Sequence, residues 1–284
     1  MHLYSNLYFF YSICIMIRLI CLRLLFGILF LPSLLLAQQM NVNPSTLTFN
    51  LAPGTTETKY VSVRNITTKQ HTFQLTMADW YRDSLGNHVY LKPGAIKQTC
   101  ASWVKLGVNV VELAPDQVVD IPVTLEVPAD YNEKEGMRWS MLFIQNYISD
   151  DSTVQKTARI TTTIREIFRV GLHIYQTPPS VTAKSALAVS LNKDKKNADT
   201  YVFEMKNNGP TMLNCYAHME LTNIESGQEF KLEVQDFPVF PGGKRLVDFK
   251  LPPTLPKGKY SALAILDYGE NSPLEAVEST IDIK

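Results

Sequence analysis

Histidine and cysteine are the side chains in this sequence best suited to catalysis or metal binding, but their spacing favours neither. Four of the five histidines follow the apolar N-terminus and lie far apart in the chain, at His71, His88, His173 and His218. Transition-metal ligands in proteins usually recur within a few residues of one another. The sequence also lacks a nucleophile elbow, a phosphate-binding glycine loop and a paired acidic motif. It therefore predicts no enzyme, no cofactor and no metal, and we expect His173 on the exposed polar face of a strand.

The two cysteines in the body of the chain, Cys100 and Cys215, fall in different predicted domains. Two cysteines in separate sandwiches rarely reach the short Cα distance that a disulfide needs. Each lies beside apolar or aromatic residues, so we expect two buried core thiols. Cys14 and Cys21 belong to the N-terminal segment.

Overall charge excludes one class of partner. The chain has 284 residues, with 27 basic and 27 acidic side chains. Nucleic-acid-binding domains normally carry a basic excess, so this balance predicts no nucleic-acid partner.

Residues 1–39 have the features of a signal peptide. Arg18 and Arg23 precede an apolar stretch, Leu24–Leu36, and Ala37 then provides a small residue for cleavage. We therefore predict export to the periplasm or cell envelope, with membrane contact only through this segment before cleavage.

Two details of this segment stay open. A start at Met16 would give a conventional signal peptide, because the residues before it are aromatic and nearly uncharged. An uncleaved membrane anchor is the alternative, although about 13 apolar residues are short for a bilayer span.

From Val42 onward, short β-rich runs alternate with turn residues every 8–12 positions, and no helical stripe interrupts them. This rhythm is typical of β-sandwiches. The segment Gln176-Thr177-Pro178-Pro179-Ser180 interrupts the rhythm, and paired prolines favour a stiff, extended linker. We predict an all-β protein with two tandem immunoglobulin-like sandwiches, at residues 40–175 and 181–284, joined by a linker at 176–180.

One predicted strand, Ala158–Tyr175, is much longer than an ordinary strand of about 5–6 residues. Its even positions are mostly apolar, from Ile160 to Ile174, whereas its odd positions are mostly polar or basic. Two readings remain open. The apolar positions either fill the core of their own domain or bind a partner along an exposed edge, which would be an aggregation hazard if left unpaired.

The first predicted domain contains an ordered series of strand and turn motifs: Leu47-x-Phe49-x-Leu51-Ala52-Pro53-Gly54, Tyr60-Val61-Ser62-Val63-Arg64-Asn65, Ala101-Ser102-Trp103-Val104, Leu113-Ala114-Pro115 and Gly136-Met137-Arg138-Trp139. This series resembles the N-terminal domain of PapD-like periplasmic pilus chaperones and of related DUF916-type surface proteins. The resemblance covers residues 41–175, and the second sandwich agrees with it in architecture only.

The resemblance implies that the long strand pairs with an incomplete protein subunit and lends it alternate apolar side chains, which is β-augmentation. The residues expected to bind a partner in this way are Ile160, Ile164, Arg165, Phe168, Arg169, Val170 and Leu172. Such chaperones also clamp the subunit's terminal carboxylate with basic residues on the first and the long strand. On the long strand, Arg165 or Arg169 could supply the basic group, since a guanidinium binds a carboxylate in bidentate fashion. The first-strand position, near Ser45–Thr46, has no basic residue.

Two functions are compatible with these features. The protein is either a periplasmic chaperone-like protein that captures a secreted or envelope subunit and assists assembly of a surface structure, or a structural adaptor in an envelope, secretion or cell-wall complex. The long alternating strand favours the chaperone, and the departure at the first strand favours the adaptor.

Overall fold

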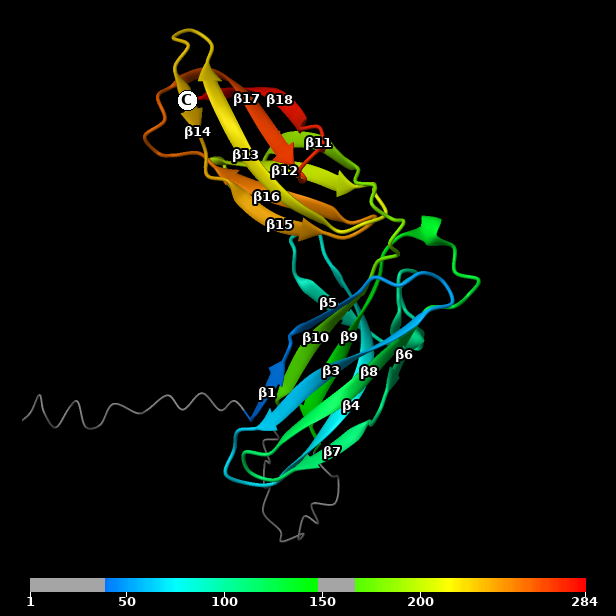
Figure 1. Cartoon of the computed structure of the whole chain (residues 1–284). Helices are drawn as coiled ribbons and strands as arrows, with labels where there is room; N and C mark the ends of the chain where they lie inside the picture. Colours follow the sequence, from blue (N-terminus) through cyan, green and yellow to red (C-terminus); the bar gives the residue numbers. More distant parts are fainter. Residues whose placement is uncertain (1–38, 148–166) are drawn as a thin grey trace, which may run out of the picture. The chain divides into compact units, whose positions relative to one another are not determined.

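The protein folds into two consecutive β-sandwiches, which confirms the predicted fold class (Figure 1). The computed structural model describes residues 39–147 and 167–284, and Gln39–Lys284 forms one compact unit. Within these residues the helical content consists of two short 3-10 turns, η1 (Ala101–Trp103) and η2 (Glu133–Glu135). None of the helices in the described ranges is long and apolar enough to cross a membrane.

The first sandwich consists of two sheets. One sheet has the order β1-β3-β8-β6, and the other has the order β2-β10-β9-β4-β5, with β7 paired to β4. The strands are β1 (Met40–Asn43), β2 (Thr46–Phe49), β3 (Thr56–Asn65), β4 (His71–Arg82), β5 (His88–Leu91), β6 (Val104–Leu106), β7 (Val110–Leu113), β8 (Val118–Glu126), β9 (Arg138–Asn146) and β10 (Arg169–Gln176).

The first segment of the chain contributes to both sheets of this sandwich. β1 pairs antiparallel with β3 in one sheet, and β2, only two residues later, pairs parallel with β10 in the other. Pro44 lies between them and has no backbone N–H to offer either ladder. The first segment therefore contributes a strand to each sheet, and its second strand, β2, lies beside β10.

Alternation of apolar and polar residues builds the first core. Val61, Val63, Ile121 and Val123 point inward from β3 and β8 and are fully or almost fully buried. Successive side chains of a strand point to opposite faces, so every second residue reaches the core. Leu142 and Ile144 of β9, together with further buried residues of β2, β4 and β10, close the same cluster from the other sheet.

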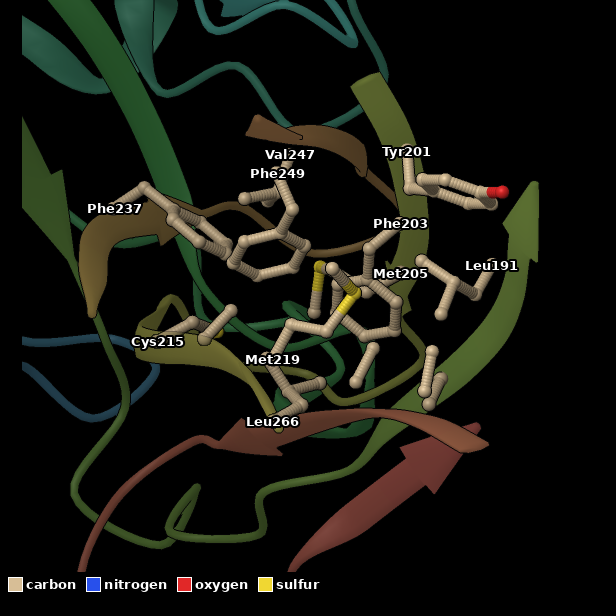
Figure 2. Close-up of a cluster of buried hydrophobic side chains, with 14 of the residues drawn as sticks. Leu191, Tyr201, Phe203, Met205, Cys215, Met219, Phe237, Val247, Phe249 and Leu266 are labelled. Carbon is tan, nitrogen blue, oxygen red and sulfur yellow. The ribbon is translucent and has the colours of Figure 1, made fainter. Parts of the chain in front are cut away.

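The second sandwich has a core of its own, drawn in Figure 2. Phe203, Phe249, Met205 and Met219 meet at its centre and are almost entirely buried. Its sheets have the orders β11-β12-β16 and β14-β13-β17-β18, with β15 paired to β13. The strands are β11 (Ala186–Lys193), β12 (Thr200–Asn207), β13 (Leu213–Asn223), β14 (Glu229–Lys231), β15 (Gln235–Val239), β16 (Lys244–Lys250), β17 (Gly258–Asp267) and β18 (Glu275–Ile283).

In each sandwich one strand ends at a fully buried asparagine. The Nδ2 group of Asn65, at the end of β3, donates to the carbonyls of Lys69 and Leu113 at 2.7 and 2.9 Å. Asn207, at the end of β12, donates in the same way to Thr211 and Val239, both at 2.8 Å. Each asparagine thus bonds to a carbonyl four residues further along the chain and to the last residue of another strand, β7 or β15.

The chain between the sandwiches has little regular structure. Gln176, where we place the start of the linker, is the last residue of β10. The predicted strand from Val181 begins only at Ala186. The sequence-based reading also missed the three short strands β1, β5 and β15.

Candidate strand-pairing interface

β10 is paired on both sides along only half of its length. All eight of its residues pair with β9, from Arg169 opposite Gln145 to Gln176 opposite Arg138. On the other side β2 covers only His173–Gln176. No other strand within residues 39–147 and 167–284 pairs with this side of Arg169–Leu172. The first half of β10 is therefore an open sheet edge within the described chain.

The register identifies which backbone groups face this edge. The amide of His173 donates to the carbonyl of Ser45 at 3.0 Å, so odd-numbered residues of β10 direct their backbone groups away from β9. The carbonyl of Phe168 accepts from Asn146 of β9 at 3.1 Å, so even-numbered residues point the other way. The N–H and C=O groups of Arg169 and Gly171 thus face the open edge.

The inward side chains of this segment become less buried toward the open half. Leu172 and Ile174 are completely buried in the first core. Phe168 and Val170 lie on the same face and pack against that core, but they are only partly buried. Leu172 therefore fills the core of its own domain, the first of the two roles considered for the apolar positions of this strand. A fully buried side chain is not available to a partner. Phe168 and Val170 lie where an added strand would extend the core.

Arg169 lies on the outer face and is exposed. Its guanidinium carbon is 4.7 Å from the centroid of the Phe143 ring, and its Nε donates to Gln145 at 2.9 Å. The cation therefore lies over the Phe143 ring beside the open edge. Ile160, Ile164 and Arg165, three further predicted partner residues, lie outside the described residues.

The outer face of β10 also carries an aromatic cluster that the sequence did not reveal. The ring centroids of Trp80 and His173 are 4.7 Å apart, and those of Trp80 and His88 are 4.8 Å apart. Tyr175 and Phe240 complete the group, and Phe240 lies 4.9 Å from Trp80. The prediction of an exposed polar environment for His173 is wrong, because its ring is half-buried against this cluster.

The structure also brings together two histidines that are 85 residues apart. The Nε2 atoms of His88 and His173 are 3.5 Å apart. Burial lowers the pKa of His173 to about 4, and the charges of His88 and Arg82 act in the same direction. Burial also lowers the pKa of His88. Both rings are therefore neutral at pH 7, and alternation along the strands could not have indicated a contact that depends on how β5 folds against the sheet.

No constellation in the described residues resembles a metal centre. Within residues 39–147 and 167–284 no group of three or more histidine, cysteine or acidic side chains could hold a metal ion. Cys100 and Cys215 are buried free thiols, as predicted. Burial raises the pKa of each thiol to about 12, so neither is a reactive thiolate near neutral pH.

Comparison with known proteins gives structural similarity only. No family model matches the sequence, and no curated protein matches it. Among solved structures, a chain of a chaperone–tip adhesin complex of CFA/I fimbriae has 9% identity and a TM-score of 0.49, with 87% of this chain and 100% of that chain covered. The class 5 fimbriae chaperone CfaA has 9% identity and a TM-score of 0.45, with 85% and 98% covered.

A third similar structure is the CsuC–CsuE chaperone–tip adhesion subunit complex of archaic chaperone–usher Csu pili from Acinetobacter baumannii. It has 9% identity and a TM-score of 0.43, with 75% of this chain and 91% of that chain covered. These structures come from chaperone systems of fimbriae and pili.

Proposed function

We propose that this protein is an exported, non-enzymatic binding protein that captures a secreted or envelope protein subunit by β-strand augmentation at the first half of β10. A strand of the subunit would pair with the edge formed by Arg169 and Gly171 and would cover Phe168 and Val170. Ile160, Ile164 and Arg165, which are also predicted to bind the partner, lie outside the described residues. Assistance in assembling a surface structure is the role that this mode of binding fits best.

The observation that carries the proposal is the combination of unpaired backbone and half-buried apolar side chains in one short segment. Each backbone hydrogen bond with an incoming strand contributes about 0.5–1.5 kcal/mol net. Covering an apolar side chain contributes up to about 1.5–3 kcal/mol, and less where it is already partly buried. Because ordering the partner opposes these gains, the described part of β10 alone supports modest affinity.

Arg169 is placed to add specificity. Its guanidinium lies beside the open edge and is exposed, so a carboxylate of the bound subunit could replace Gln145 as its partner. A charge-assisted bidentate bond has a defined geometry and would favour one register of the added strand over others.

Two variants at one position test whether backbone pairing is responsible. Arg169→Pro removes an N–H that faces the open edge, whereas Arg169→Ala keeps this N–H and removes only the side chain. We expect Arg169→Pro to lower partner capture by up to about tenfold, because one backbone hydrogen bond contributes about 0.5–1.5 kcal/mol. Arg169→Ala should retain more of the capture.

Capture is measured by photocrosslinking from position 170 in native envelopes, with the crosslinked protein identified by mass. Thermal unfolding of both variants shows whether the first sandwich is still intact. A folded Arg169→Pro variant that captures its partner as well as the parent protein would exclude the open edge as the binding surface.

A permanent adaptor would use the same edge differently, and the absence of a basic residue on β2 favours this second candidate. A chaperone releases its subunit during assembly, so labelled and unlabelled subunit should exchange and the complex should be sub-stoichiometric. An adaptor should purify with a fixed ratio of large partners that do not exchange.

A further inference from the structure

A second candidate site lies between the β4–β5 hairpin and the start of β16. It is a cavity of about 270 Å³, and its lining includes Arg82, Arg245, Trp139 and Phe240. The sequence did not indicate this site, because its two arginines are 163 positions apart and come from different sandwiches.

Direct contacts hold the two sides of the cavity together. The amide of Leu246 donates to the carbonyl of Ser84 at 2.8 Å. Gly86 contacts the guanidinium of Arg245 so closely that any β-carbon at this position would collide with it. Gly86 also has a φ of +90°, a conformation that favours glycine. The Arg245 side chain is therefore positioned by the hairpin itself.

Both guanidinium groups contain buried nitrogens without hydrogen-bond partners. These atoms are Nε of Arg82 and both Nε and Nη1 of Arg245. The side chain of Arg82 makes one bond, from Nη1 to the carbonyl of Gly86 at 2.8 Å. Leaving a buried donor unpaired is destabilising, and more so for a charged group. Such an arrangement favours binding of an acceptor.

The charges of the site favour an anion. Burial lowers the pKa of Arg245, and the positive charge of Arg82 lowers it further, while Asp83 and Asp248 act in the opposite direction. The Asp83 carboxylate is engaged within its own hairpin, where it accepts from the amides of Leu85 and Asn87, both at 2.9 Å. Within the described residues, no ion pair joins a carboxylate to either arginine.

We propose that Arg82 and Arg245 form a binding site for an oxyanion, either a carboxylate of a bound polypeptide or a small free anion such as phosphate. A guanidinium presents a planar pair of N–H donors to two oxygens of one anion, and both guanidiniums line the same cavity. The cavity holds more than an isolated phosphate, and Trp139 and Phe240 provide apolar walls for an attached chain. This site is independent of strand pairing at β10.

Titration of the whole exported protein, residues 40–284, with acetate and phosphate tests the site. The readouts are the melting temperature and binding calorimetry, with chloride at equal ionic strength as the reference. We expect a saturable rise of the melting temperature with at least one oxyanion. Arg245→Gln should weaken binding at least about tenfold. Lys250→Gln, an equal charge change at an exposed position of the same strand, should leave binding unchanged.

A peptide with a free C-terminal carboxylate and its amidated form distinguish the two sources. Competition by the free-acid peptide alone assigns the site to a polypeptide carboxylate, whereas binding of phosphate without competition assigns it to a free anion. If Arg245→Gln does not fold, Arg245→Lys serves instead, since it keeps the charge and loses the bidentate geometry.

An effect of acetate and phosphate no greater than that of chloride, or an unchanged effect in the Arg245 variants, would overturn the site. Partner capture through β10 would be unaffected by that outcome. Failure of this proposal is therefore distinguishable from failure of the proposed function.

Discussion

The two halves of β10 have the same neighbour on one side and different surroundings on the other. His173–Gln176 lies between β9 and β2, so both of its sides are paired. Among the residues that the structure describes, Arg169–Leu172 pairs with β9 alone. Apolar side chains alternate through both halves, but Ile174 is fully buried whereas Val170 is only partly buried. One strand thus combines a half that is paired on both sides with a half whose second side is open within the described residues, and the length of β2 sets the boundary.

We call His173–Gln176, which is paired on both sides, the closed half of β10, and Arg169–Leu172 the open half. Removal of a core side chain from the closed half should cause the largest loss of stability. Ile174→Ala should lower the free energy of unfolding by about 2–5 kcal/mol, because it removes a fully buried side chain and leaves a cavity. Denaturant unfolding of the variant measures this. A loss of less than about 1 kcal/mol would contradict the contrast, because the closed half would then tolerate loss of an inward side chain as well as the open half does.

The second-largest loss of stability should follow removal of the buried side-chain amide of Gln176, at the end of the closed half. Gln176 is fully buried and bonds to both backbone groups of Leu51, donating to its carbonyl at 2.6 Å and accepting from its amide at 3.2 Å. Gln176→Ala should cost about 1–3 kcal/mol by leaving these groups unpaired. Gln145→Ala, which removes an amide opposite the open half, is the matched control and should cost less than about 0.5 kcal/mol. Equal losses of stability in Gln176→Ala and Gln145→Ala would contradict the contrast between the two halves of β10.

Acidification should also act mainly on the closed half. The pKa of His173 is lowered to about 4 in the fold, against an ordinary value of 6.5. The unfolded chain therefore binds more protons between these values, so the stabilisation is complete above pH 6.5 and is lost as the pH falls toward 4. We expect a loss of roughly 1–2 kcal/mol, allowing for partial exposure of the ring. Denaturant unfolding at several pH values measures it, and His173→Asn should flatten the dependence.

The smallest effect on stability should come from the open half. Val170→Ala removes two methyl groups that are only partly buried, so the free energy of unfolding should fall by less than about 1 kcal/mol. Partner capture should fall by a larger factor than stability predicts, because the same side chain would be covered by an added strand. Crosslinking from position 168 measures capture. Unchanged capture together with a large loss of stability would place Val170 with the side chains of the closed half.

Several features of the fold follow from local patterns. Strands such as β8 and β13 alternate apolar and polar residues so regularly that their faces could be predicted. The short strands β1, β5 and β15 were missed because four or five residues carry too little periodicity, and pairing with a long neighbour makes them strands.

For the candidate sites, the sequence determined the alternation along β10 and the separation of the two thiols, because both depend on neighbours in the chain. Tertiary structure alone decided that β2 covers only half of β10, that His173 contacts His88, and that Arg82 and Arg245 line one cavity. The physical reason is that periodicity specifies which face of a strand is apolar, whereas edge pairing and contacts between distant side chains depend on where each strand stops and which loop folds over it.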